Sequence, residues 1–531
     1  MSLMDEMERK IDIMVDDFQA ICAAYGMANQ AAEELIITNI FLYKFLNDKF
    51  MMQKKKFLER SGKSMDQIFL NEENTLAYLS EHMIEDDFAD QVQKVLDHIS
   101  ENVRDRGWTI LSVGGKRIPL FDNILNVINV EQRNDFMRDI FRIIQREKFD
   151  FDVMGASDDA FDYYSHIFEH LINKYNVASG VYAEYYTPQS AAKIISRCLV
   201  GMGDKIMDAE IYDPAAGTGT LIVQMAQELK NDRPIIYTQD ISVKSTRLLR
   251  LNLILNDMTE LVGNAVQGDT LLYPAYHAVA DDLSSRLKQF DYIVANPPFK
   301  TDFSAVRDKI DEKWKGSGRF FAGIPNVPKS KKTGMAAYTM FLQHILYSLK
   351  PEGRAAVIVP AGFLNAKTNI EKRIRKQLID DKILKGVIMM PAYLFSHTGT
   401  NIAILFIDRA NRDESALLMD ASHFGKKIKN GGHKRTVLSD QEIEKIVECF
   451  TKRVNLEKVS ASVDYRDIEK NNYSFSAGQY FYKENQDGEM ITQEEFQKII
   501  EGHQKKILQL FEEGHALESE IKDLLEMLRD G

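Results

Sequence analysis

Short β-rich runs alternate with helical stretches between about residues 180 and 410, and this alternation limits the possible folds more than any other feature. It is typical of βαβ units, in which helices connect parallel strands and cover both faces of one sheet. We therefore expect an α/β fold with a mostly parallel sheet. The expected strands are 206–212, 235–240, 265–270, 292–295 and 353–360, followed by 384–390 and 401–407, which could form an edge hairpin.

Ligands of such sheets bind in the crevice beyond the carboxyl ends of the strands. The turn Asp213-Pro-Ala-Ala-Gly-Thr-Gly-Thr220 follows the first expected strand, and its glycines, Gly217 and Gly219, allow a ligand to approach the backbone closely. The full dinucleotide fingerprint and the P-loop sequence are both absent from this turn. Asp240 ends the second strand, where it could bind ribose hydroxyls, and Asp269 could approach an adenine edge. These acids suit a nucleoside without phosphates, such as S-adenosylmethionine.

The fourth expected strand ends in two prolines. Pro297 and Pro298 prevent both further strand pairing and entry into a helix, so Asn296 and Phe299 should lie in a stiff turn at the strand tip. An amide edge beside an aromatic face suits a flat polar heterocycle. An ordinary Pro-Pro turn with a buried phenylalanine is the alternative, and this stretch alone does not distinguish the two.

The regions before and after the expected strands have helical sequence patterns. Apolar residues at helical spacing in 36–46 and 135–144 predict a helical N-terminal domain, and 158–175 reads as a further amphipathic helix. The last residues carry a heptad pattern, with apolar side chains at eight of the ten positions 496, 500, 503, 507, 510, 514, 517, 521, 524 and 528. A coiled-coil-like seam and an intramolecular amphipathic helix fit this pattern equally well. The predicted domains are 1–155, 156–410, 411–487 and 488–531.

The chain is acidic, with a net charge of -12, which argues against a large basic surface for nucleic acid. The segment 300–333 is the exception that we identify. It has nine Lys and Arg residues (300, 307, 309, 313, 315, 319, 329, 331 and 332) against four acids (302, 308, 311 and 312). Trp314, Phe320 and Phe321 lie among these charges, a combination that suits nucleic-acid contact. A merely solvated loop is the alternative.

Cysteine usage and hydropathy predict a cytoplasmic protein. Cys22, Cys198 and Cys449 are far apart and have neither metal-site nor disulfide-framework spacing. The N-terminus is acidic, and no apolar run approaches the roughly 20 residues that would span a bilayer. We expect no metal site, and we interpret His344, in an apolar helix, as a structural residue.

Two motifs in order carry a family resemblance. The run from Asp213 to Gly219, followed by Asn296-Pro-Pro-Phe299, resembles the amino-methylating DNA methyltransferases, in the γ order of the N6-adenine enzymes. The stretch Ala183-Glu-Tyr-Tyr-Thr-Pro-Gln189 resembles the cofactor-binding element that precedes the first strand in type I restriction–modification methylase (M) subunits. Similar stretches at 41–46, 252–255 and 471–480 extend the resemblance along most of the chain. The sequence departs from the family at Ala183 and Thr220, where Gly is common, and at Asp240, where Glu is common.

The resemblance implies a Rossmann-like S-adenosylmethionine-dependent methyltransferase core with an α-helical N-terminal domain and a C-terminal helical tail. Asn296 and the Pro297 carbonyl would accept hydrogen bonds from adenine N6, and Phe299 would stack on a flipped base. Pro298 completes the catalytic set. The implied cofactor-binding residues are Glu184, Tyr185, Tyr186, Thr187, Pro188, Gln189, Asp213, Gly217, Thr218, Gly219, Thr220, Asp240 and Asp269.

The same resemblance implies partners. A separate specificity subunit would read the DNA while two methylase subunits modify it, and a restriction subunit can join the complex. Residues 488–531 are our candidate for docking on the specificity subunit. Two alternatives stay open: a protein-glutamine N5-methyltransferase with the same catalytic tetrapeptide, and a non-enzymatic scaffold with a methyltransferase fold.

Overall fold

The computed structural model describes residues 3–28, 30–60, 70–101, 110–146, 170, 187–256, 258–277, 286–367, 369–395, 401–430 and 433–481, and residues 501, 502, 504–506, 508–510, 512, 514 and 517. Its contacts divide the chain into two compact units, 1–477 and 478–531. In the second unit the described residues from 501 to 517 are helical, and Leu510 and Leu517 are 60% and 58% exposed. Apart from Leu510, Gly514 and Leu517, the predicted heptad positions lie outside the described residues.

The helical character predicted for the N-terminal region is confirmed, although the segment 158–175 lies outside the described residues except for His170. A short hairpin that we did not predict lies between α4 and α5, and Val113 in its turn donates a backbone hydrogen bond to Gln267 O (2.9 Å). The elements are α1 (Leu3–Ala24), α2 (Gln30–Arg60), η1 (Glu72–Asn74), α3 (Leu76–Glu81), α4 (Phe88–Glu101), β1 (Ile110–Leu111), β2 (Arg117–Ile118), η2 (Ile124–Val127), η3 (Val130–Gln132) and α5 (Arg133–Arg146).

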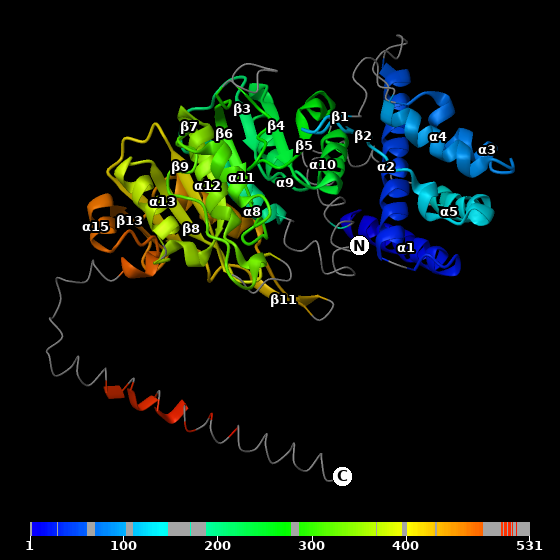
Figure 1. The fold of residues 1–531 in the computed structure, drawn as a ribbon. Helices are drawn as coiled ribbons and strands as arrows, with labels where there is room; N and C mark the ends of the chain where they lie inside the picture. Colours follow the sequence, from blue (N-terminus) through cyan, green and yellow to red (C-terminus); the bar gives the residue numbers. More distant parts are fainter. Residues whose placement is uncertain are drawn as a thin grey trace. The chain divides into compact units, whose positions relative to one another are not determined.

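The predicted α/β core is present as a nine-stranded sheet with the order β13-β10-β8-β9-β7-β6-β3-β4-β5 (Figure 1). The run from β7 to β5 is parallel, as is the β10–β8 pair, whereas β9 and β13 run antiparallel to their neighbours. The strands are β3 (Glu210–Asp213), β4 (Ile235–Asp240), β5 (Ala265–Gln267), β6 (Phe290–Ala295), β7 (Leu349–Pro360), β8 (Leu384–Met389), β9 (Ile402–Asp408), β10 (Ser415–Asp420) and β13 (Ser460–Asp464).

The predicted pairing of 384–390 with 401–407 is confirmed, but its placement at a sheet edge is wrong. β9 lies between β8 and β7, and β10 and β13 continue the sheet beyond β8. All seven residues of β9 are buried, as expected for a strand that is covered on both faces. The sheet therefore draws two of its strands from the region after residue 410.

Helices and a second hairpin complete the first unit, and one continuous apolar core contains residues of the N-terminal helices as well as of the sheet. Lys49 Nζ on α2 donates to Ile254 O on α10 (3.1 Å), which connects the two regions. The elements are α8 (Gln189–Gly201), α9 (Thr220–Glu228), η4 (Lys230–Asp232), α10 (Val243–Leu255), η5 (Thr259–Asn264), α11 (Arg307–Trp314), η6 (Lys332–Gly334), α12 (Ala337–Ser348), η7 (Ala361–Leu364), α13 (Asn369–Asp380), β11 (Lys426–Asn430), β12 (His433–Val437), α14 (Asp440–Thr451), α15 (Tyr465–Lys470) and η8 (Ala477–Gln479). Among the described helices, none combines the length and apolarity of a bilayer-spanning segment.

The basic segment 300–333 is more ordered than a solvated loop, since it contains α11 and η6. Its Arg319 is fully buried, and the guanidinium donates to the carbonyls of Thr270 and Leu271, each at 2.8 Å. Arg319 also lies 4.3 Å from the centroid of the Trp314 ring. Arg319 therefore serves the core and is not exposed for nucleic-acid contact, which corrects that part of the prediction, whereas Trp314 is half-buried.

His344 has the structural role that we predicted. It is buried in α12, where its imidazole lies 3.2 Å from Tyr212 Oη and 3.2 Å from Arg319 Nε. Burial, reinforced by the charge of Arg319, lowers the pKa of His344 well below its ordinary value. A neutral imidazole inside the core is the consequence.

Candidate active site

Three neighbouring parallel strands bring the predicted motifs to one edge of the sheet. β6, β3 and β4 are adjacent in the sheet, and their carboxyl ends are Ala295, Asp213 and Asp240. The glycine turn follows Asp213, and the tetrapeptide Asn296-Pro-Pro-Phe299 follows Ala295. Residues that are far apart in the sequence therefore meet where an α/β sheet binds its ligands.

Hydrogen bonds from backbone amides to two carboxyl groups fix the glycine turn between β3 and α9. Asp213 Oδ1 accepts from Ala215 N (2.9 Å), and Asp240 Oδ2 accepts from Gly217 N (2.8 Å). Gly217 and Gly219 have φ angles of +54° and +86°, which residues with a Cβ rarely adopt. The turn is thus shaped by its glycines and attached to the neighbouring strand by Asp240.

Gly219 is also the N-cap of α9, where it supplies no side-chain hydrogen bond to the first turn of the helix. A Cβ at this position would lie 2.1 Å from Leu249 Cδ1 on α10. The helix therefore packs closely on its neighbour, and its N-cap residue offers no side chain to its first amides. Such a helix end favours a negatively charged ligand group.

The two carboxyl groups of the crevice are electrostatically unusual. Burial raises the pKa of Asp213 to about 8, the Ala215 amide opposes this shift, and the nearby charge of Asp240 adds to it. Burial also raises the pKa of Asp240, opposed by the amides of Ser242 and Gly217. Neighbouring carboxyls with raised pKa values are more common at functional sites than in ordinary cores.

Replacing Asp213 by asparagine is expected to change how stability depends on pH. Folding raises the pKa of Asp213 from 3.8 to about 8, so the folded protein holds this proton more tightly than the unfolded chain does. The contribution of this carboxyl to stability is therefore complete below about pH 4 and is lost as the pH rises toward about 8. Relative to the wild type, the variant should gain roughly 1 kcal/mol in free energy of unfolding per pH unit between about pH 5 and pH 7.

Urea denaturation across this pH range measures the difference. Asp204→Asn, which neutralises an exposed carboxylate before β3, is the matched control and should follow the wild type. If the free energy of unfolding depended on pH in the same way for the wild type and Asp213→Asn, Asp213 would not have a raised pKa in the folded protein.

The tetrapeptide Asn296-Pro-Pro-Phe299 contacts the segment that precedes α8. Asn296 Nδ2 donates to Thr187 Oγ1 (3.1 Å), and Thr187 is only 6% exposed. This bond orients the amide and leaves Asn296 Oδ1 as an acceptor. Pro297 is buried, Pro298 and Phe299 are half-buried, and the Phe299 ring packs edge-on against Tyr338 with centroids 6.4 Å apart.

Five predicted site residues line one small cavity of about 10 Å³, which has room for roughly one water molecule. They come from three separate segments, and the cavity lining consists of Thr187, Asp213, Ala215, Ala216, Thr218, Thr220, Leu221 and Asn296.

The other predicted residues lie around this cavity or outside the described chain. Pro188 is the N-cap of α8 and Gln189 its first residue. Asp269 Oδ1 accepts from Leu271 N (2.9 Å) and so shapes the turn after β5. Glu184, Tyr185 and Tyr186 lie outside the described residues.

One residue that supports the site received no role from the sequence. Asn252 on α10 is 3% exposed, and its Nδ2 donates to Thr218 O in the glycine turn (3.1 Å). Asn256 Nδ2 in turn donates to Asn252 Oδ1 (2.9 Å). The sequence signal that could have identified Asn252 is its position between the apolar residues Leu251 and Leu253, because a buried amide needs a hydrogen-bond partner.

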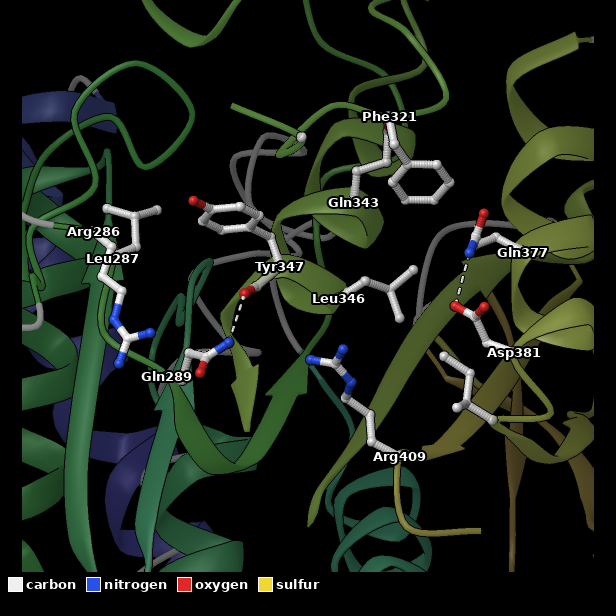
Figure 2. A pocket seen from close by; sticks show the side chains of 12 residues that line it. Arg286, Leu287, Gln289, Phe321, Gln343, Leu346, Tyr347, Gln377, Asp381 and Arg409 are labelled. Atoms are coloured by element: carbon white, nitrogen blue, oxygen red, sulfur yellow. Dashed lines mark hydrogen bonds between the residues drawn. The ribbon is translucent and has the colours of Figure 1, made fainter. Parts of the chain in front are cut away.

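A larger cavity, of about 460 Å³, lies elsewhere (Figure 2). Leu287 and Gln289 in its wall come just before β6, and Arg409 comes just after the antiparallel β9. These positions belong to the amino end of β6, opposite the edge that carries Asn296. Two of its lining residues are hydrogen-bonded, since Gln289 Nε2 donates to Tyr347 O (3.4 Å). We therefore take the smaller cavity as the candidate site, because of its place in the sheet and not because of its size.

Comparisons with known proteins agree with this geometry. Residues 159–489 match the family model described as N-6 DNA Methylase. The methylase subunit of the type I restriction enzyme MpnII from Mycoplasma pneumoniae is 28% identical over 377 residues, 69% of this chain and 64% of that protein. The MjaIX methylase subunit from Methanocaldococcus jannaschii is 27% identical over 388 residues, 69% of this chain and 63% of that protein. The chain thus spans slightly less than two thirds of the length of these two relatives.

A solved structure shows the same fold. The methyltransferase subunit of a type I restriction-modification system from Streptococcus thermophilus superimposes with a TM-score of 0.63 at 20% sequence identity, over 90% of this chain and 99% of that one. The Rossmann-like methyltransferase core that we expected from the sequence is therefore present.

Proposed function

Because the chain belongs to the N-6 DNA methylase family, we propose that it methylates adenine N6 in DNA as the modification subunit of a type I restriction–modification complex. S-adenosylmethionine is the methyl donor. The observation that carries the proposal is the cavity at the carboxyl edge of the sheet, where Thr187, the glycine turn and Asn296 meet. The similar type I methylase subunits support the same assignment.

The crevice residues fit this cofactor. Each oxygen of Asp240 already accepts one backbone N–H, from Gly217 and from Ser242, and each keeps a second lone pair for a ribose hydroxyl. The uncapped N-terminus of α9 suits the methionine carboxylate. The cofactor, when bound, supplies an electrophilic methyl group on its sulfonium. In this proposal Asp269 lies toward the adenine of the cofactor. The methionine and ribose parts are lined by Glu184, Tyr185, Tyr186, Thr187, Pro188, Gln189, Thr218 and Thr220.

The catalytic tetrapeptide holds the target base. Asn296 Oδ1 and the Pro297 carbonyl accept the two hydrogens of the adenine amino group, which turns the N6 lone pair out of ring conjugation and toward the methyl group. Phe299 stacks on the flipped base, and Pro298 keeps the turn stiff. Thr187 orients the Asn296 amide through its 3.1 Å hydrogen bond. Alignment of the reacting atoms therefore supplies much of the rate enhancement.

Replacing Asp240 by asparagine is expected to weaken S-adenosylmethionine binding about 10- to 100-fold, because hydrogen bonds to a charged acceptor are lost. The amide NH2 would also face one of two N–H donors, Gly217 N or Ser242 N, and would disturb the turn. Isothermal titration calorimetry measures the dissociation constant. Asp204→Asn is the control for charge, and an unchanged affinity in Asp240→Asn would remove Asp240 from the cofactor site.

One experiment separates the proposed function from its alternatives. The purified chain, with and without a candidate specificity subunit, is incubated with labelled S-adenosylmethionine and either DNA or a release-factor protein. N6-methyladenine in the DNA, identified by mass spectrometry, supports the proposal. Methylglutamine in the protein would favour the glutamine methyltransferase, and no transfer to either would favour the scaffold.

The partners follow from the same proposal. Two copies of this chain join one specificity subunit in the cytoplasm, and a restriction subunit completes the complex. Residues 488–531 dock on the specificity subunit, and residues 1–155 form the helical domain. Residues 156–410 form the catalytic domain together with β10 and β13, which the extension 411–487 adds to its sheet. Deleting the residues after Asp487 should abolish co-purification of the specificity subunit while cofactor binding persists; the opposite pattern would refute the docking role.

A further inference from the structure

A basic hairpin stands apart from the main sheet. β11 (Lys426–Asn430) and β12 (His433–Val437) form a separate two-stranded antiparallel ribbon, with Lys427 opposite Thr436 and Ile428 opposite Arg435. It projects from the body of the first unit in Figure 1. Residues 426–435 contain five Lys and Arg residues (426, 427, 429, 434 and 435) and no acid, in a chain whose net charge is -12.

Topology places this hairpin at the catalytic edge. β10 is parallel to β8. Since β8 and β7 are both antiparallel to β9, they run in the same direction, and β7 is parallel to β6. The carboxyl end of β10, Asp420, therefore lies at the same edge as Ala295 of β6, and the hairpin follows Asp420 after a short turn. Thr436 fixes its base there, since its N and Oγ1 donate to Tyr393 O (2.9 Å) and Ala392 O (2.6 Å), just beyond β8.

Three lysines of the hairpin are exposed and lack an acidic partner among the described residues. Lys426, Lys427 and Lys434 are exposed, and within the part of the chain that the structure describes they form no ion pair. The nearby acid Glu442 is already engaged, because its oxygens accept from Gly425 N and Ser439 N. A cluster of like charges costs folding free energy, which a polyanionic partner would offset.

We propose that the hairpin formed by residues 426–437 binds the phosphate backbone of duplex DNA beside the target adenine. The proposal rests on the proposed function for the identity of the target. A two-stranded ribbon is narrow enough to lie along or enter a duplex groove, and exposed lysines at its surface bind phosphates without reading sequence. The hairpin thus positions the duplex over the catalytic edge, and the choice of sequence is left to another subunit.

The test compares two triple variants with equal changes in charge. Lys426→Gln/Lys427→Gln/Lys434→Gln removes exposed charge from the hairpin. The control of equal charge change replaces Lys205, Lys230 and Lys382 by glutamine; all three are exposed and come shortly before β3, β4 and β8, at the opposite edge of the sheet. Lys205 and Lys382 form surface ion pairs with Asp232 and Glu414, which contribute at most about 1 kcal/mol each to stability. Fluorescence anisotropy with a short duplex of random sequence, over a range of salt concentrations, measures affinity for each full-length protein.

The hairpin variant should bind the duplex at least about 10-fold more weakly at low salt, and its log–log salt slope should fall in magnitude by about 2 to 3, because each phosphate contact contributes roughly 0.9. The control should retain the wild-type slope, and thermal unfolding should be the same for all three proteins. Equal slopes in the two variants would overturn the proposal.

Two further outcomes are distinguishable. Loss of the specificity subunit from the hairpin variant, with duplex affinity unchanged, would overturn the proposal in favour of an acidic protein partner. If the wild type transferred no methyl group to any DNA while the slope difference persisted, the DNA-binding hairpin would stand and the proposed function would fall.

Discussion

Replacing Asn296 by alanine is expected to lower kcat for adenine methylation about 100- to 1,000-fold, the usual cost of removing one preorganised hydrogen-bonding group from an active site. In the proposed mechanism, Asn296 Oδ1 accepts a hydrogen from adenine N6, while its Nδ2 is held by Thr187 Oγ1 at 3.1 Å. The truncated residue keeps the proline turn but no longer turns the N6 lone pair toward the methyl donor. Quantification of N6-methyladenine under single-turnover conditions measures the rate.

The cofactor provides the internal control for this variant. Asn296 acts on the base, so the dissociation constant for S-adenosylmethionine should change by no more than about 3-fold, well below the loss in rate. Asn326→Ala, which truncates an exposed asparagine in the segment after Phe299, should behave as the wild type. An undiminished rate in Asn296→Ala would show that the tetrapeptide does not perform the reaction.

Replacing Gly219 by alanine is expected to lower the free energy of unfolding by about 2–5 kcal/mol, the sum of two independent penalties. The φ angle of +86° is unfavourable for a residue with a Cβ, and the added atom would lie 2.1 Å from Leu249 Cδ1. Relief of the clash requires the buried Leu249 side chain to change its rotamer or the glycine turn to shift, and either change would disturb the packing beside the cavity. Urea denaturation should show the loss of stability, and calorimetry should show weaker cofactor binding.

Two comparisons separate the penalties. Gly362→Ala adds the same methyl group where nothing lies within 4 Å and φ is not positive, so it should be nearly neutral. Gly219→Ala combined with Leu249→Ala removes the clash but keeps the strained backbone, so the effect of Gly219→Ala should be smaller in that background. Equal effects in both backgrounds would mean that the contact with Leu249 does not limit this position.

Local chemistry explains which parts of the fold could be predicted from the sequence. The strand 235–240 was predicted with the bounds that the structure has, because a β-rich run there ends at an acid and a helix start. Pro297 and Pro298 located the end of β6, since they cannot continue a strand. The glycines of the turn after Asp213 have the positive φ angles that glycine tolerates. Each of these features is encoded within a few residues.

Long-range packing explains the errors. Arg319 belongs to a basic run, yet it is buried against Thr270 and Leu271. The residues from Ile402 to Asp408 predicted a strand that pairs with β8, but nothing in them indicated that β10 and β13 extend the sheet beyond β8. Neither position could be inferred locally, because it depends on partners that are distant in the sequence.

The α/β class, the turns after Asp213 and before Phe299, and the family resemblance could all be inferred from the amino-acid sequence, because backbone restriction and side-chain chemistry act over short distances. The three-dimensional fold was needed to show which turns meet, that Thr187 holds Asn296 and that Asn252 supports the glycine turn. It was also needed to show that the hairpin at Lys426 follows a strand whose carboxyl end lies at the same edge as Asn296. The order and direction of the strands set these relations, and strand order depends on the packing of the whole sheet.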